Sequence, residues 1–282
     1  MPPSTLCMKR LSLHETNCLK RVSVVTIARF STARPLSEKP SDGDEVKKNF
    51  QSLVDDIFAS QRFKSQIKPS QKHQMYSQFL DGLVETRHST IGNIGKLCAI
   101  FRKQDFAEKK ILDILYAHIS RSAGKMNCVD VYQTLRFMME SGVCKVDPFV
   151  RTKQRLMQVY KHMDSTALSC SIKAIASFDK SNVDGNIIVL FARFLKIWRV
   201  RRAKVCELLN ISSAARECSY RDKALANRIL NETLFLHGRK ELSMHDISHI
   251  HTALQGIGYH SQQLENAMLA SSMRTKGIIV FG

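Results

Sequence analysis

The sequence lacks the patterns of a sheet protein and of a membrane-spanning protein. No segment shows a sustained alternation of apolar and polar residues, which excludes a fold built mainly from strands. Only residues 277–281 have strand-like composition, and that stretch is too short to define a sheet. No run approaches the roughly 18 apolar residues that a membrane-spanning helix needs. We therefore expect a helical protein.

Motifs of catalysis and metal binding are also missing. The sequence contains no phosphate-binding loop, no dinucleotide-binding fingerprint and no nucleophile elbow. His245 and His249 have the spacing of two ligands on one helix face, with His251 close by, but no acidic third ligand of obvious role accompanies them. Structural or surface histidines are the more common case. We expect no catalytic residue, no metal and no cofactor, and we expect that the chain is not an enzyme.

The cysteines do not form a disulfide framework or a redox motif. None of the 8 belongs to a C-x-x-C pair. Several lie at apolar helical positions, where a free thiol behaves as a small hydrophobic group. This usage is typical of a reducing compartment.

Acidic residues are scarce throughout the chain. The sequence has 43 Lys and Arg against 25 Asp and Glu, which gives a net charge of +18. In the leader, residues 1–34, six Lys or Arg face Glu15 alone, so +5 belongs to this segment and +13 to the rest. A charge of that size favours polyanionic partners, such as nucleic acid or an acidic lipid surface.

The leader has the composition of a mitochondrial transit peptide. It is rich in Arg, Lys, Ser and Thr, and residues 29–33, Arg-Phe-Ser-Thr-Ala, resemble a matrix-protease site. A secretory signal is an alternative, but its apolar core, residues 22–28, would be short and would contain Ser23 and Thr26. A disordered tail is a second alternative. We favour import into the mitochondrial matrix, with residues 35–45 as a linker.

A repeating pattern follows the linker, and it predicts the fold. Its reference positions, which are almost evenly spaced, are Phe106, Val146, Val183, Tyr220 and Tyr259. Nine residues before them stand the apolar residues Leu97, Phe137, Ala174, Ile211 and Ile250. One further unit fits upstream, with Pro69 as its reference position. A period of about 38 residues with helical patterns inside it indicates stacked helical hairpins.

The repeat therefore predicts an all-α protein, an α-solenoid of five or six hairpins of about 38 residues each, within residues 46–276. The apolar positions Phe50, Val54 and Ile57 predict a first helix, and Pro69 begins the second. The later helices are expected near 90–104, 107–121, 128–140, 147–163, 166–178, 184–200, 202–217, 221–237, 244–256 and 260–274. Residues 277–282 would form a C-terminal tail.

Ten residues before the reference positions stands a column of polar residues. These residues, which we term the polar column, are Lys96, Arg136, Lys173, Asn210 and His249. Repeat proteins that recognise RNA present a few side chains per repeat in this way. A solvated helix face, which every surface helix has, is the alternative reading. Together with the net charge, the pattern makes the polar column a candidate RNA-binding surface.

A second candidate site is denser in charge. We term it the basic cluster: Lys196, Arg199, Arg201, Arg202 and Lys204. The cluster surrounds Trp198, the only tryptophan. Cations of this kind neutralise phosphates, and an exposed indole stacks on bases. A helix end with basic residues and a buried Trp198 is the alternative, and burial is the more common fate of a lone tryptophan. We therefore favour the cations over the ring as RNA contacts.

The period, the helical hairpins, the basic charge and the leader together resemble the octotricopeptide and heptatricopeptide repeat family, relatives of the repeats in FAST-kinase-domain proteins. The resemblance covers about residues 50–274. It implies an organellar protein that binds single-stranded or ribosomal RNA and acts in transcript stability, RNA processing or ribosome assembly and structure. Many members carry a C-terminal RAP domain, for which residues 275–282 are too few.

Two functions follow as expectations. The first is a mitochondrial RNA-binding factor, acting in RNA metabolism or as a component or assembly factor of the mitochondrial ribosome, with ribosomal proteins or other repeat proteins as further partners. The alternative is a protein-binding scaffold or accessory subunit of a mitochondrial complex. A basic surface favours the first, and an apolar or acidic surface favours the second.

Overall fold

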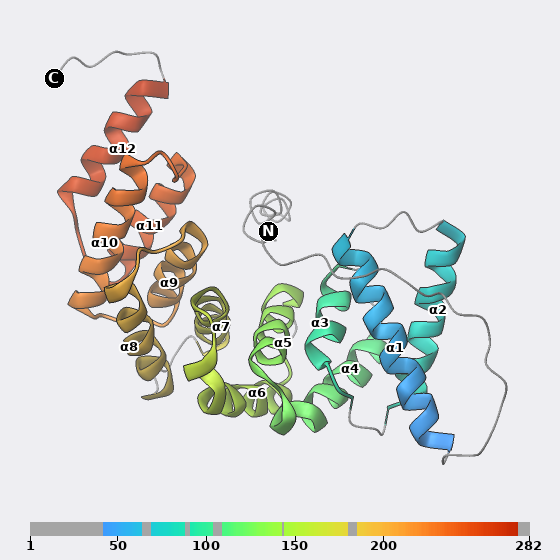
Figure 1. The fold of residues 1–282 in the computed structure, drawn as a ribbon. Helices are drawn as coiled ribbons and strands as arrows, with labels where there is room; N and C mark the ends of the chain where they lie inside the picture. Colours follow the sequence, from blue (N-terminus) through green and yellow to red (C-terminus); the bar gives the residue numbers. More distant parts are fainter. Residues whose placement is uncertain are drawn as a thin grey trace, which may run out of the picture. The chain divides into compact units, whose positions relative to one another are not determined.

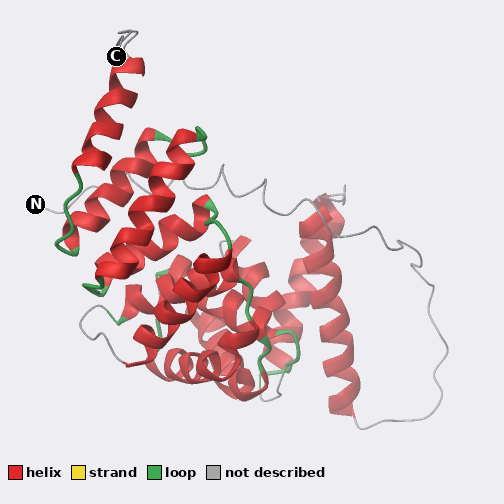
Figure 2. Cartoon of the chain, turned by 60° about the vertical axis from the view of Figure 1, so that its left-hand side comes forward, coloured by secondary structure: helices red, strands yellow, loops and turns green. Residues whose placement is uncertain are grey.

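The computed structural model describes residues 42–63, 69–87, 91–103, 109–142, 144–179 and 185–275. Within these ranges the expected all-α fold is confirmed, because they contain only helices, two short 3₁₀ turns and connections (Figures 1 and 2). The helices are α1 (Asp42–Phe63), α2 (Pro69–Glu85), α3 (Ile94–Lys103), α4 (Lys109–Ser122), α5 (Cys128–Ser141), α6 (Val146–Val159), α7 (Ser165–Phe178), α8 (Gly185–Val200), α9 (Val205–Glu217), α10 (Lys223–Gly238), α11 (Met244–Gly256) and α12 (Gln262–Thr275).

Consecutive helices pair into six hairpins, from α1–α2 to α11–α12, as the repeat predicts. Most helix ends lie within a few residues of the positions expected from the sequence. α1 is an exception, because it begins at Asp42, inside the stretch 35–45 that the composition marks as a linker. The leader 1–34, the tail 277–282 and the reference positions Phe106 and Val183 lie outside the described residues.

The first helices of the hairpins form a continuous row. α1 packs on α3, and this packing continues through α5, α7 and α9 to α11. The second helices pack on one another less extensively. In this row α2 packs on α4, α4 on α6, α8 on α10 and α10 on α12. Packing of each hairpin on the next is the arrangement of a solenoid, where each unit covers the apolar face of its neighbour.

The apolar column identified in the sequence forms the core of the first row. Its five members, nine residues before the reference positions, are all buried. The described reference positions Val146, Tyr220 and Tyr259 fall where the first helix of a hairpin turns into the second, and two of them contact the preceding hairpin. Tyr220 stacks on Phe191 with ring centroids 4.7 Å apart, and the Tyr259 hydroxyl donates to Asn227. The repeat in the sequence therefore reflects two structural features, a buried position in each first helix and the turn between the two helices of a hairpin.

Local sequence sets several helix ends. Ser243 and Asp246 form the capping box that their spacing predicts at the start of α11. Asn127 and Asp130 form another at the start of α5. Gly142 ends α5 with a φ of 65°, in the left-handed region that glycine adopts without steric cost.

No helix among the described residues is long and apolar enough to cross a membrane. The six cysteines in these ranges are free thiols, and three of them are buried. Burial raises the pKa of the Cys98 thiol to about 12, although its hydrogen bond with Thr134 opposes this shift. A thiol with that pKa stays protonated and unreactive at neutral pH.

The contact between α3 and α5 requires a glycine. The Gly95 amide donates to the Asp130 carboxylate over 2.9 Å, and a Cβ atom at Gly95 would lie 2.7 Å from the Asp130 Cα. Because that neighbour is backbone, the two helices would have to move apart to admit a methyl group.

We expect Gly95→Ala to lower the free energy of unfolding by about 1–3 kcal/mol, the usual effect of overpacking a tight contact. Gly124→Ala is the matched control, since a Cβ atom there would meet nothing within 4 Å. Urea denaturation of both variants measures the difference. Equal stability of the two variants would contradict the close approach of α3 and α5.

Candidate nucleic-acid interface

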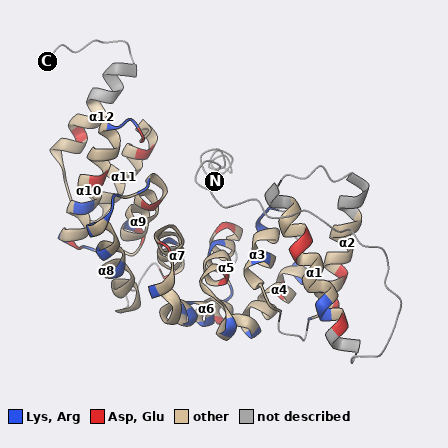
Figure 3. Ribbon diagram, in the orientation of Figure 1, with Lys and Arg blue, Asp and Glu red and all other residues tan. Residues whose placement is uncertain are grey.

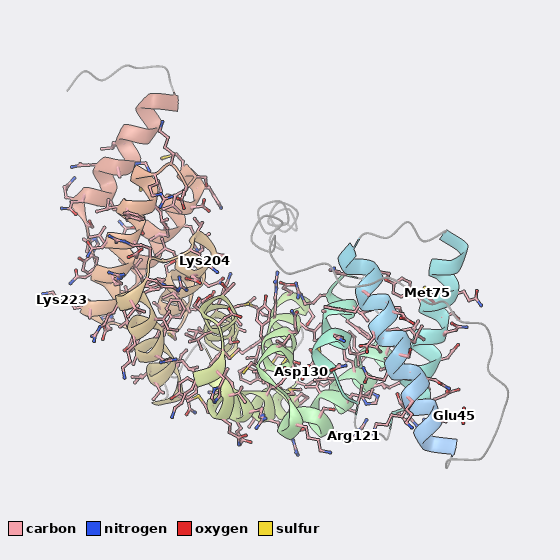
Figure 4. All side chains as sticks on the ribbon, viewed as in Figure 1. Glu45, Met75, Arg121, Asp130, Lys204 and Lys223 are labelled. Atoms are coloured by element: carbon pink, nitrogen blue, oxygen red, sulfur yellow. The ribbon has the colours of Figure 1, made fainter. Side chains whose placement is uncertain are left out.

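The positive charge is concentrated in the fourth and fifth hairpins. Residues 185–240, which comprise α8, α9 and α10, contain 12 Lys and Arg against 4 Asp and Glu (Figure 3). The basic cluster lies in this region, at the end of α8 and in the connection to α9. Lys204, labelled in Figure 4, is the residue that immediately precedes α9.

Trp198 is fully buried, as expected for a lone tryptophan. Its ring packs edge-on against Phe194, with centroids 4.8 Å apart, and its indole Nε1 donates to a Glu207 carboxylate oxygen over 3.5 Å. The ring is therefore part of the core between α8 and α9 and is not available for stacking on a base.

Glu207, in the first turn of α9, is buried in the core and binds the connection between α8 and α9, residues 201–204. Its fully buried carboxylate accepts hydrogen bonds from the Ser165 hydroxyl at 2.6 Å, the Arg201 guanidinium at 2.7 Å and the Lys204 amide at 3.2 Å. Burial raises the pKa of this carboxyl group, but the hydrogen bonds from Arg201, Ser165 and the Lys204 amide, together with the charge of Arg201, lower it below 4.5. Glu207 is therefore ionised at neutral pH, with Arg201 as its partner.

A second buried carboxylate, Glu232 of α10, holds the same connection from the other side. It accepts hydrogen bonds from the Ala203 amide at 3.0 Å and from the Arg202 guanidinium at 3.2 Å. Arg228, one turn earlier on α10, forms an ion pair with it at 2.9 Å. Residues 201–204 thus lie between two buried carboxylates, each of which binds both backbone and side-chain donors of this connection.

The basic cluster therefore contains cations of two kinds. Arg201 is committed to Glu207. Lys196 and Arg199 are exposed, and neither has an ion-pair partner among the described residues. Arg202 lies over the Phe235 ring, 4.2 Å from its centroid, and its side chain keeps 57% of its surface exposed. Lys204 is exposed, and its ammonium group donates to the Thr166 hydroxyl at 3.3 Å.

The polar column lies along the contact between successive first helices. Its five members are half-buried. Lys96 pairs with Asp55 of the preceding hairpin at 2.7 Å, and Asn210 donates to Ser169 of the preceding first helix at 3.3 Å.

Two other members of the polar column also contact protein side chains. The Arg136 guanidinium bonds to Glu140 one turn later on its own helix, at 2.6 Å. His249 Nε2 lies 2.7 Å from the Ser213 hydroxyl. Lys173 is different, because it has no ion-pair partner among the described residues. An RNA contact through this column stays a prediction, and most of its members already bind protein groups.

The histidines near the C-terminus do not form a metal site. No group of three or more potential ligands converges anywhere in the part of the chain that the structure describes. His245 is exposed, and His251 Nε2 faces the Glu265 carboxylate of α12 at 3.6 Å.

Two residues important for the site, Glu207 and Glu232, are not evident from the sequence as parts of it. Glu207 stands at the third position of a helix, where an acid commonly caps the N-terminus, and Glu232 follows Arg228 at ion-pair spacing. These signals indicate local pairing, but they do not indicate full burial.

Comparison with known proteins adds no assignment, because no protein-family model matches the chain and no curated protein gives a significant match.

We expect Glu207→Gln to destabilise the protein by about 1.5–3 kcal/mol, because an amide nitrogen would face donors that now share a carboxylate. The carboxylate stabilises the fold above its unfolded pKa of about 4.5, and this contribution is lost as the pH falls through the lower folded-state pKa. The free energy of unfolding of the variant should therefore fall less steeply with acidification than that of the parent protein. Urea denaturation at a series of pH values measures both effects.

Glu241→Gln is the control for this test, since its partly exposed carboxylate pairs with an exposed Arg239. Its expected change is within about 0.5 kcal/mol. A Glu207→Gln variant as stable as this control would contradict the role of Glu207.

Proposed function

We propose that this chain is a mitochondrial RNA-binding helical-repeat protein, acting in mitochondrial RNA metabolism or as a component or assembly factor of the mitochondrial ribosome. The observation that carries the proposal is the basic cluster, where a connection fixed by two buried carboxylates carries exposed cations. The nearby carboxylates, Glu207 and Glu232, are buried and pair with Arg201, Arg202 and Arg228. Lys196, Arg199 and Lys204 have no acidic partner among the described residues.

Counterion release gives this arrangement its affinity for RNA. Lys and Arg side chains that displace condensed cations from a phosphate backbone gain free energy that depends on salt. Lys196 and Arg199 have no ion pair with any described residue to break before they contact a phosphate. Arg202 is held against Phe235, so it loses less side-chain freedom on binding than a free arginine.

The cations of the basic cluster differ in role. Arg201 binds a buried carboxylate, and removing it would leave that charge without its main partner. We therefore assign phosphate contacts to Lys196, Arg199 and Lys204, and Arg201 to fixing the connection. Arg202 is assigned a phosphate contact as well, because its partner Glu232 also pairs with Arg228.

We expect the double variant Lys196→Ala/Arg199→Ala to bind single-stranded RNA less tightly than the parent protein. If each side chain neutralises one phosphate, the slope of log affinity against log salt should become shallower by about 1.4. Fluorescence anisotropy with a mixed-sequence oligonucleotide, at several salt concentrations, measures the slope.

The matched control is Lys109→Ala/Lys110→Ala on α4, which removes the same charge from two exposed lysines of another hairpin. Its slope should equal that of the parent protein. If both variants changed the slope equally, the effect would come from net charge alone. If the parent protein did not bind RNA even at low salt, the scaffold function would replace this proposal.

Mitochondrial targeting is tested separately from RNA binding. Residues 1–45 fused to a fluorescent reporter should direct it to the mitochondrial matrix, because the leader is basic and nearly free of acid. Fluorescence microscopy with a matrix marker, together with the size of the processed fusion, measures import. Secretion or cytosolic retention of the fusion would contradict the targeting proposal.

A further inference from the structure

The exposed face of α8 carries apolar side chains, although the solvated face of a helix is normally polar. Three of the nine large apolar side chains that are exposed in the described ranges belong to this helix: Ile188 at 41%, Val189 at 41% and Val200 at 85%. Ala192, which lies between them in the sequence, is exposed as well. Single exposed apolar residues are common on soluble proteins, but several on one helix face indicate contact with another molecule.

The apolar residues share this face with two cations of the basic cluster. At 3.6 residues per turn, positions seven or eleven residues apart on a helix lie nearly above one another. Lys196 follows Val189 by seven residues, and Arg199 follows Ile188 by eleven. The opposite side of α8, which includes Phe191, is buried in the core. The outer side of α8 is therefore a mixed aliphatic and cationic surface.

No acidic residue of α8 neutralises this surface, since Gly185–Val200 contains neither Asp nor Glu. Lys196 and Arg199 also lack an ion-pair partner in the part of the chain that the structure describes. The distance along the helix from Val189 to Arg199 is about 15 Å, at a rise of about 1.5 Å per residue. The aliphatic part of the face thus continues directly into the cations that we assign to phosphate contacts.

A nucleotide strand presents both kinds of group that this face matches. Its phosphates are anionic, and the faces of its bases are largely apolar. In a duplex the base faces are stacked on one another, whereas unpaired bases can be splayed out against protein side chains. Apolar side chains pack against bases that have left the stack. An unpaired strand can therefore cover both the aliphatic and the cationic part of the face.

We propose that the outer face of α8, formed by Ile188, Val189, Ala192, Lys196 and Arg199, binds an unpaired segment of RNA. Its bases pack on the three aliphatic side chains, and its phosphates bind the two cations. This inference rests on the proposed function and adds a second source of affinity to it. Burial of aliphatic surface stabilises the complex without the release of counterions, so it favours strands with accessible bases.

The test is the double variant Ile188→Ala/Val189→Ala, which shortens two exposed side chains and places a good helix former at both positions. Its affinity for single-stranded RNA should fall by about three- to tenfold, because less apolar surface is removed from water. The slope of log affinity against log salt should stay as in the parent protein, whereas Lys196→Ala/Arg199→Ala should flatten it. Fluorescence anisotropy at several salt concentrations measures both quantities, and circular dichroism checks that the helices are retained.

The matched control is Val146→Ala/Val150→Ala, which shortens two exposed side chains of α6, at 77% and 42% exposure. It should bind RNA as the parent protein does. A second ligand, a strand of the same length built from abasic nucleotides, keeps the phosphates and lacks the bases. The parent protein and Ile188→Ala/Val189→Ala should bind this abasic strand equally well.

The outcomes separate this inference from the proposed function. If RNA binding depends on Lys196 and Arg199 but not on Ile188 and Val189, the base contact is overturned and the RNA-binding function stands. The base contact is also overturned if the aliphatic variant binds the abasic strand as poorly as it binds RNA. If the variant loses affinity only for vesicles of anionic phospholipid, the face docks on lipid instead. If the parent protein binds no RNA even at low salt, the proposed function fails, and this inference fails with it.

Discussion

Stacking of each first helix on the next is the constraint on which the rest of the structure depends. A single hairpin of this size cannot bury its apolar stripe alone. α7 shows this most clearly, because nine of its residues are buried, and they include Ala167, Ser171 and Ala174. Small side chains of this kind allow neighbouring helices to approach closely. A charged side chain on such a helix is therefore half-buried, as Lys96 and Lys173 are, or has a partner inside the core, as Glu207 does.

The sequence predicted the fold well because the fold is repetitive. The same buried column recurs in five of the six hairpins, so each of these repeats supports the assignment of the others. Caps such as Ser243 with Asp246 are local in sequence and were predicted for the same reason. The start of α1 was not, because residues 42–45 have a composition that is equally typical of linkers.

The burial of the two glutamates could not be predicted, since it depends on distant partners. Glu207 is bonded to Ser165, 42 residues earlier, and Glu232 to Ala203, 29 residues earlier. In the sequence, Glu207 lies within the expected helix 202–217, and only the packing of α9 on α7 reveals that this position is inside. For the same reason, Arg199 and Arg201, which are two residues apart and look equivalent in sequence, have different environments. Arg199 is exposed, and Arg201 binds the buried Glu207.

This division of cations is what links the fold to the proposed function. Buried acids bind part of the positive charge to hold the connection between hairpins, and the remainder faces solvent in α8 and at the start of α9. Ultraviolet crosslinking of RNA to the full chain, with mass spectrometry of the crosslinked peptides, tests this account most directly. The account predicts crosslinks within residues 196–204, where the side chains assigned to phosphate contacts lie. Crosslinks confined to α1 and α2, or none at all, would contradict it.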